Sequence, residues 1–266
     1  MPLINIGVVL FLILILSRIK KYMLKHAIFF IIISHVAYAS DWDKVRFQNL
    51  ASGKTYPISI GSGFFVNQDN IVTNKHVVEH CLNIAVRGAV KPTLVKLLFV
   101  DNNLDLAVLQ SPLAPMRVPY LRNNHSEIHI GDILFSIGYP LERGETGNYI
   151  ILEAKVLNTR KDSDTGFSHI EFTDNVNHGN SGGPLLDKNS NLVGVVTAKL
   201  VYKYSDPNIP PKNVALAIGV EGLIDFLKKS SIPYASSSSY DIFTNYHVDR
   251  LTKDYVVNIH CVQNNK

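Results

Sequence analysis

The hexapeptide Gly179–Pro184, GNSGGP, places one serine among three glycines and a proline. A serine hydroxyl attacks a carbonyl only when a base takes its proton, and the reaction also needs backbone N–H groups directed at the oxyanion. Glycine tolerates the backbone angles that would direct the N–H groups of Gly179 and Ser181 into one such hole. The alternative is an ordinary tight loop in which Ser181 has no role. The hypothesis of a nucleophile therefore requires a histidine and a carboxylate elsewhere in the chain.

A histidine and an aspartate that precede this loop in the sequence lie at positions suited to such a site. His76 lies in IVTNKHVV, where a strand-like run ends and a short turn begins. Asp105 lies in NLDLAVLQ, directly before another apolar run. A carboxylate at such a position is costly to bury unless it accepts hydrogen bonds, and the ring N–H of His76 is a suitable donor. The alternative for Asp105 is an ordinary turn residue. The order of these residues along the chain is His76, Asp105, Ser181.

A metal site is the competing interpretation of the same histidine. The stretch from His76 to His80, HVVEH, fits the pattern H-x-x-E-H of one class of zinc peptidases. On a helix, these two histidines could bind zinc and Glu79 could act as the base. The surrounding sequence indicates strand, turn and strand, which leaves little room for a helix of the required length. We therefore expect no metal and no cofactor.

The rest of the chain consists mainly of short β-like runs separated by Asn, Asp, Gly and Pro. One set runs from about Tyr56 to Gln110 and a second from about Asp132 to Gly219, with a Pro-rich and polar linker at 111–124. Many short strands with turn signals favour a sandwich or a barrel. The segment 221–229, EGLIDFLKK, has the spacing of a short amphipathic helix. The tail at 233–266 contains a serine run, 236–239, that we interpret as a flexible joint, and DYVVNIHCV is compatible with one more strand.

Charge and composition exclude one class of partner. The chain has 26 Lys and Arg residues and 22 Asp and Glu residues, and four of the basic residues but no acidic residue lie in residues 1–39. The remainder is balanced in charge, so nothing in it predicts binding to nucleic acid.

Residues 1–39 are predicted to be a targeting segment. Two apolar runs, 3–16 and 27–33, are separated by a basic stretch, and neither reaches the roughly 20 residues of a spanning helix. Read from Met23, the chain has a basic n-region, an apolar h-region and a small-residue cleavage site at 37–39, Ala-Tyr-Ala. We expect a signal peptide cleaved after Ala39, with Met23 as a plausible true start. The alternative is an uncleaved membrane anchor. Both place the body of the protein outside the cytoplasm, in the periplasm or in the medium.

The sequence resembles the trypsin-like serine proteases of the bacterial HtrA (Deg) kind. The resemblance covers about residues 61–227 and includes SGFFV, IVTNKHVV, DLAVL, SIGYP, FTDNVNHGNSGGPL, LVGVVTA and NVALAIGV, in this order. It implies an all-β protein with two six-stranded antiparallel barrels and a short C-terminal helix. It also implies a serine endopeptidase in which Ser181 is the nucleophile, His76 the general base and Asp105 the residue that orients His76. The amides of Gly179 and Ser181 would form the oxyanion hole.

The resemblance further predicts a substrate pocket, lined by Asn175, Val176, His178, Val195, Thr197 and Lys199. The segment between the Thr-Asp pair at 173–174 and Ser181 is one residue shorter than in many relatives, which affects the shape of this pocket. No acidic residue in the set selects Arg or Lys, so we expect a small or medium apolar side chain before the scissile bond. Lys199 or His178 would instead favour an acidic one.

The resemblance also bears on the domains and partners. The predicted domains are a leader at 1–39, a protease domain at 40–232 and a C-terminal tail at 233–266. The tail is too short for the peptide-binding PDZ domain of many relatives, so peptide-gated activation through such a domain is not expected. Unfolded or damaged proteins are the expected substrates, and a homo-oligomer is compatible with the resemblance. The alternative function is an exported chaperone or protein-binding module on the same fold, because a fold does not fix an activity.

The two cysteines, Cys81 and Cys261, leave two states open. Export permits a disulfide, and the alternative is two buried free thiols. In the trypsin-like fold the C-terminal end crosses back towards the first barrel. The resemblance therefore implies that a Cys81–Cys261 bond would hold the tail near the active-site cleft.

Overall fold

The computed structural model describes residues 45, 47–48, 50–123, 127–142, 145–146, 148–173, 177–202, 212–237 and 244–264. The predicted leader lies outside the described residues. Within the described part of the chain, no helix is both long enough and apolar enough to cross a membrane.

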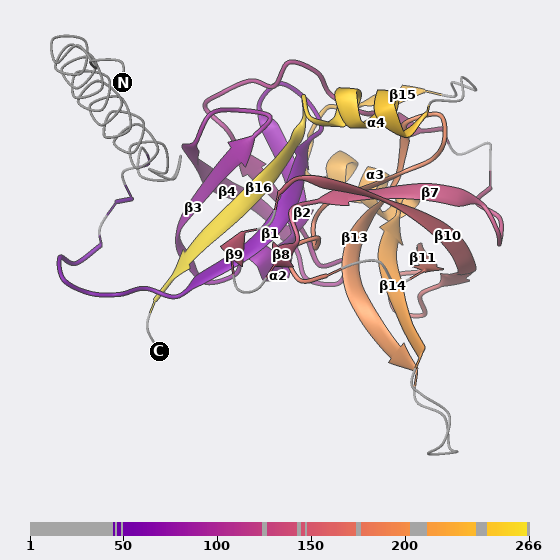
Figure 1. The fold of residues 1–266 in the computed structure, drawn as a ribbon, viewed down its shortest axis with the longest axis horizontal. Coiled ribbons are helices and arrows are strands. Elements are labelled where there is room, and N and C mark those ends of the chain that lie inside the picture. The colour runs from indigo at the N-terminus through magenta and orange to yellow at the C-terminus, as the bar shows by residue number, and fades with distance from the viewer. Residues whose placement is uncertain are drawn as a thin grey trace, which may run out of the picture. The chain divides into compact units, whose positions relative to one another are not determined.

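Six antiparallel strands close into a first barrel, drawn in indigo, purple and yellow in Figure 1. The order of the strands around the barrel is β1-β16-β3-β4-β5-β2. Their bounds are β1 (Ile58–Phe65), β2 (Asn70–Asn74), β3 (Cys81–Gly88), β4 (Thr93–Asp101), β5 (Leu106–Gln110) and β16 (Val256–Gln263). Phe64 and Phe65 have no exposed surface, so the end of β1 is buried on both of its faces.

A second barrel follows in the chain and is drawn in magenta to orange (Figure 1). Its strands follow the order β12-β7-β10-β11-β14-β13, and pairing of β12 with β13 closes the ring. Their bounds are β7 (Ile133–Gly138), β10 (Ile150–Lys161), β11 (Ser168–Thr173), β12 (Pro184–Leu186), β13 (Asn191–Tyr202) and β14 (Lys212–Gly219). The short strands β6 (Tyr120–Arg122) and β15 (Ala235–Ser237) extend this sheet beyond β13, and β8 (Leu141–Glu142) pairs with β9 (Glu145–Thr146). The predicted fold of two six-stranded antiparallel barrels is confirmed.

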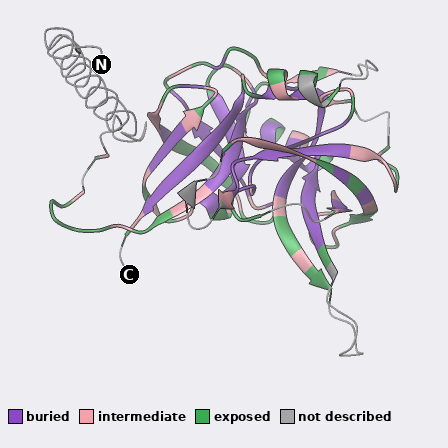
Figure 2. Cartoon of the chain, in the orientation of Figure 1, coloured by how far each residue is buried: buried purple, intermediate pink, exposed green. Residues whose placement is uncertain are grey.

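Most of the buried residues lie in the strands of the two barrels, which are largely purple in Figure 2. The predicted C-terminal helix is also present, as α3 (Val220–Lys229). Leu223, Phe226 and Leu227 form its buried face, while Glu221 lies in its first turn and two lysines in its last. These charges complement the helix dipole at both ends.

The last strand of the chain belongs to the first barrel. β16 pairs with β1 on one side and with β3 on the other, so that Asn258 lies opposite both Ser62 and Arg87. Another helix, α4 (Asn245–Thr252), precedes it. β16 is therefore part of the protease domain, and the predicted boundary at residue 232 separates it from the barrel that it completes. The reason is geometric, since without β16 there is a gap between β1 and β3.

A disulfide joins Cys81, at the start of β3, to Cys261 in β16, and the two Cα atoms are 5.3 Å apart. The bond closes a loop with a sequence separation of 180 residues. Chain entropy gives about 5 kcal/mol of stabilisation for a loop of this length, because the unfolded chain loses the most freedom when the loop is long. We predict that the double variant Cys81→Ser/Cys261→Ser loses about 3–5 kcal/mol of unfolding free energy, measured by urea denaturation of the oxidised proteins. A loss below 1 kcal/mol would contradict this account.

His260, in β16, makes the stability of the protein depend on pH. Burial lowers the pKa of His260 from 6.5 to about 4, and the positive charge of Arg87 makes a smaller contribution in the same direction. The unfolded chain therefore binds a proton as the pH falls below about 6.5, and the folded chain does not. The contribution of His260 to the unfolding free energy is therefore complete above about pH 6.5. It is lost between about pH 6.5 and pH 4, and the loss is roughly 3 kcal/mol in total.

We predict that His260→Gln removes this loss, so the difference in unfolding free energy between variant and wild type changes by roughly 3 kcal/mol between pH 7 and pH 4. Chemical denaturation at each pH measures it. His80→Gln is the matched control, because the His80 side chain is 80% exposed. Equal pH profiles for wild type and His260→Gln would show that His260 does not resist protonation.

Candidate active site

A short helix holds His76 at the end of β2. This helix, α2 (Lys75–Val78), is anchored by Val77 and Val78, both of which are buried. The His76 side chain remains 47% exposed. Because α2 ends at Val78, His76 and His80 do not share a helical face, and the helix that the zinc hypothesis requires is absent. His80 instead has a φ of 63° and an exposed side chain.

Asp105 faces His76 from the turn between β4 and β5. Its Oδ2 lies 2.6 Å from His76 Nδ1, and its Oδ1 accepts the backbone N–H of His76 over 3.0 Å. Since a carboxylate only accepts, Nδ1 carries the ring proton and Nε2 is left to act as an acceptor. Asp105 has a φ of 53°, in the left-handed region that costs a non-glycine residue roughly 1–2 kcal/mol. Its carbonyl accepts hydrogen bonds from Lys75 N and Asn74 Nδ2, at 2.9 and 3.0 Å, which stabilise this conformation.

The loop with Ser181 requires glycine at two positions. Gly179 and Gly182 have φ angles of 98° and 84°. A Cβ atom on Gly182 would lie 2.2 Å from Ser62 O and 2.2 Å from Thr73 Oγ1. This contact explains why the residue after the serine has no side chain, because the loop packs directly against β1 and β2 of the first barrel.

Thr197, from β13, connects the serine to the aspartate. The hydroxyl of Ser181 donates to Thr197 O over 3.3 Å, and the hydroxyl of Thr197 donates to Asp105 Oδ2 over 3.1 Å. The structure therefore brings His76, Asp105 and Ser181, which come from both barrels, into one site. Thr197 was predicted as a pocket residue only, and its contact with Asp105 was not anticipated.

The amides of Gly179 and Ser181 are available for an oxyanion. Among the described residues, neither N–H donates a backbone hydrogen bond. The carbonyl of His178 accepts from Leu141 N at 2.6 Å, and a trans peptide then directs the N–H of Gly179 the opposite way, away from Leu141. The direction of the Ser181 N–H is fixed in the same way. The carbonyl of Asn180, in the same peptide, accepts from Gly183 N at 2.9 Å, so the N–H of Ser181 points to the opposite side.

The predicted substrate pocket is only partly visible. Asn175 and Val176 lie outside the described residues. His178 and Lys199 are exposed and Thr197 is half-buried, which leaves them accessible to a substrate. Val195 has no exposed surface and packs in the hydrophobic core, so its side chain does not line a pocket. The prediction for Val195 was wrong.

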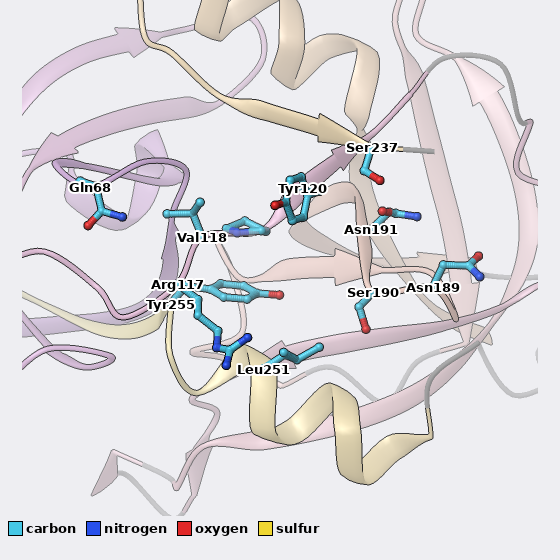
Figure 3. A pocket seen from close by; sticks show the side chains of 11 residues that line it. Gln68, Arg117, Val118, Tyr120, Asn189, Ser190, Asn191, Ser237, Leu251 and Tyr255 are labelled. Carbon is cyan, nitrogen blue, oxygen red and sulfur yellow. The ribbon is translucent and has the colours of Figure 1, made fainter. Parts of the chain in front are cut away.

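Two cavities in the structure lie away from these residues. One, of about 470 Å³, has an apolar wall that includes Tyr120, Leu251 and Tyr255, and Ser190 and Ser237 lie at its polar side (Figure 3). The other, of about 430 Å³, is mainly polar and is lined by Arg122, Arg160 and Glu221 among others. Neither is lined by His76, Asp105 or Ser181, so neither is the substrate pocket.

Comparison with known proteins agrees with the geometry. A family profile described as trypsin-like peptidase domain matches residues 61–195, more than half of the chain. A probable DegP-like periplasmic serine endoprotease of Bartonella henselae is 36% identical over 172 residues, which cover 63% of this chain and 32% of that protein. Human serine protease HTRA4 is 32% identical over 154 residues, or 55% of this chain and 32% of that protein. The matched region spans about a third of the length of these relatives.

Solved structures share the fold. A serine endoprotease from Yersinia pestis has a TM-score of 0.52 and 24% identity, covering 68% of this chain and 60% of that one. A protease of Mycobacterium tuberculosis in its active form has a TM-score of 0.54 and 21% identity, covering 70% and 85%.

Proposed function

Because this chain belongs to the trypsin-like peptidase family, we propose that it is a serine endopeptidase that cleaves peptide bonds through an acyl-enzyme formed on Ser181. The observation that carries this proposal is the continuous set of contacts that links His76, Asp105, Thr197 and Ser181. The amides of Gly179 and of Ser181 itself donate no backbone hydrogen bond within the described part of the chain.

Acylation uses each of these groups. The hydroxyl of Ser181 leaves Thr197 O and turns to His76 Nε2, which takes its proton as a bond forms between Oγ and the substrate carbonyl carbon. The electron pair of the carbonyl moves to its oxygen, where the N–H groups of Gly179 and Ser181 stabilise the negative charge. Asp105 stabilises the imidazolium that forms, and it holds His76 in place by accepting one hydrogen bond from the ring Nδ1 and one from the backbone N–H.

The remaining steps reverse these roles. The imidazolium gives its proton to the leaving nitrogen as the C–N bond breaks, which releases the amine and leaves an acyl-enzyme. A water then gives a proton to His76 Nε2 and attacks the ester carbon. Collapse of the second intermediate returns the proton to Ser181 Oγ and releases the acid.

Export and the substrate class are part of the proposal. The apolar leader and its small-residue cleavage site support export, as does the periplasmic location in the name of the Bartonella henselae relative. Sequencing the N-terminus of protein recovered from the exported fraction tests this, and an N-terminus at Ser40 is expected. Unfolded proteins are the proposed substrates, because a peptide bond must lie in an extended and accessible segment to reach Ser181.

Cleavage of casein by the purified protein tests the function. We expect cleavage that is lost in Ser181→Ala and after reaction with a serine-directed phosphonate, and that persists in EDTA. Cleavage that survives Ser181→Ala, or that stops in EDTA, would contradict the proposal. Binding of casein without cleavage by a well-folded wild type would favour a protein-binding module.

A further inference from the structure

Ser62 in β1 joins the first barrel to the loop that carries the nucleophile. We call this segment, His178–Gly183, the oxyanion loop. The hydroxyl of Ser62 donates to Gly179 O over 2.7 Å and accepts the N–H of Tyr139 over 2.9 Å. The backbone N–H of Ser62 donates to Ser181 O over 2.8 Å. Ser62 has no exposed surface, so water does not compete for these contacts.

Ser62 holds the peptide that lies between the two amides of the oxyanion hole. Its hydroxyl fixes the carbonyl of Gly179, and planarity then fixes the N–H of Asn180 on the opposite side, where it donates to Asn177 O at 3.1 Å. Rotation of this peptide would tilt the N–H of Gly179 on one side and the N–H of Ser181 on the other. The loop resists such rotation poorly by itself, because Gly179 tolerates many backbone angles.

Loss of the Ser62 hydroxyl would leave two partners without a hydrogen bond. These are the carbonyl of Gly179 and the N–H of Tyr139, and a buried backbone group without a partner is unfavourable. The site is closely packed, since a Cβ atom on Gly138 would lie 2.7 Å from Ser62 Oγ. The loop would therefore lower its free energy by turning the carbonyl of Gly179 towards another donor, and the two amides of the oxyanion hole would lose their alignment.

We propose that Ser62 is a positioning residue that aligns the oxyanion hole from the opposite barrel. The proposal rests on the proposed function of Ser181. It assigns Ser62 a role in stabilising the transition state and none in substrate binding. The reason is that its side chain is buried between its own strand, Tyr139 and the oxyanion loop.

The test compares Ser62→Ala with Ser136→Ala. Ser136 is also a buried serine, in β7, but its hydroxyl has no hydrogen-bond partner among the described residues. Peptide hydrolysis gives kcat and KM, with the concentration of active sites titrated by a phosphonate. A peptide aldehyde, whose adduct with Ser181 places an oxygen in the hole, reports on the alignment of the two amides. Thermal unfolding shows whether each variant is folded.

For Ser62→Ala we expect kcat to fall roughly 10- to 100-fold, somewhat less than loss of a direct oxyanion donor. We also expect the inhibition constant of the aldehyde to rise by a similar factor, with KM within about twofold of the wild type. Ser62→Cys replaces the hydroxyl with a thiol, which is larger and a weaker donor, and should give an intermediate kcat. Ser136→Ala should match the wild type in all three quantities.

A folded Ser62→Ala with a wild-type kcat would overturn the proposal, and so would a change in KM alone. Loss of folding in both Ser62 variants, with Ser136→Ala folded, would assign Ser62 to stability and would equally overturn it. Failure of the proposed function gives a different result, because the wild type itself would then show no turnover that depends on Ser181.

Discussion

Asp105→Asn will lower kcat by about 10⁴-fold and leave KM within a few-fold of the wild type, because the substitution selects the wrong tautomer of His76. The two oxygens of Asp105 have different partners. Oδ1 accepts the backbone N–H of His76, and Oδ2 accepts from His76 Nδ1 and from Thr197 Oγ1. An asparagine has a single oxygen for these two positions.

The backbone contact decides which way the asparagine turns. If its oxygen faced the ring, its NH₂ group would face the N–H of His76, which can only donate. The oxygen therefore keeps the backbone N–H, and the NH₂ group faces Nδ1. Nδ1 must then accept, so the ring proton moves to Nε2, and Nε2 can no longer take the proton of Ser181. The hydroxyl of Thr197 can rotate to accept from the NH₂ group and adds to the stability of this arrangement.

Steady-state hydrolysis of a peptide substrate measures the effect. Asp101→Asn is the matched control in the same turn, because Asp101 Oδ1 accepts from Asn103 N and Leu104 N and an asparagine oxygen can do the same. We expect this control to retain nearly the wild-type kcat. A kcat for Asp105→Asn within tenfold of the wild type would show that His76 does not depend on Asp105 for its tautomer.

Ser181, His76 and Asp105 could be selected from the sequence because each has a local signal. Ser181 is surrounded by glycines, His76 follows a strand-like run, and Asp105 precedes one. Their meeting in one site follows from the two barrels, which the family resemblance implied, whereas the short strands and turns alone favoured either a sandwich or a barrel. The loop that contains Ser181 was predictable for the same reason, since its glycines are required by positive φ angles and close contacts.

Side-chain direction along β13 was not predictable. Val195 and Thr197 are two residues apart, so a regular strand would place them on the same face. The pairing with β14 shifts between Val196 and Ala198, which is the signature of a bulge. A bulge redirects side chains, and Val195 is buried in the core whereas Thr197 reaches Asp105. Nothing in the sequence LVGVVTA marks the position of the bulge.

The strands with which β16 pairs could not be predicted from the sequence of that segment alone. The apolar run in DYVVNIHCV indicated a strand, but the partner of a strand is set by distant residues. Here Ser62 pairs with Asn258, far along the chain, and α4 lies between the serine run and the strand. Composition suggested a flexible joint and a tail, whereas the strand pairing makes β16 part of the first barrel.

A chain that ends at residue 232 will not fold into an active enzyme, because its first barrel cannot close. Such a chain lacks α4 and β16, and it leaves the hydrogen-bonding edges of β1 and β3 without a partner. It also removes four apolar side chains of β16 that are fully or almost fully buried, Val256, Val257, Ile259 and Val262. At roughly 2 kcal/mol each, their burial contributes about 8 kcal/mol, which is comparable with the total stability of a typical domain.

The measurement is the unfolding transition and the peptidase activity of the truncated chain beside a chain that ends at residue 264. The longer chain retains all of β16 and should unfold cooperatively and cleave peptides as the wild type does. The shorter chain should show no cooperative transition and no turnover, although it retains His76, Asp105 and Ser181. If it folded and cleaved peptides, the first barrel would close without β16, and positioning of the β1 residues that contact the oxyanion loop would not depend on the C-terminal strand.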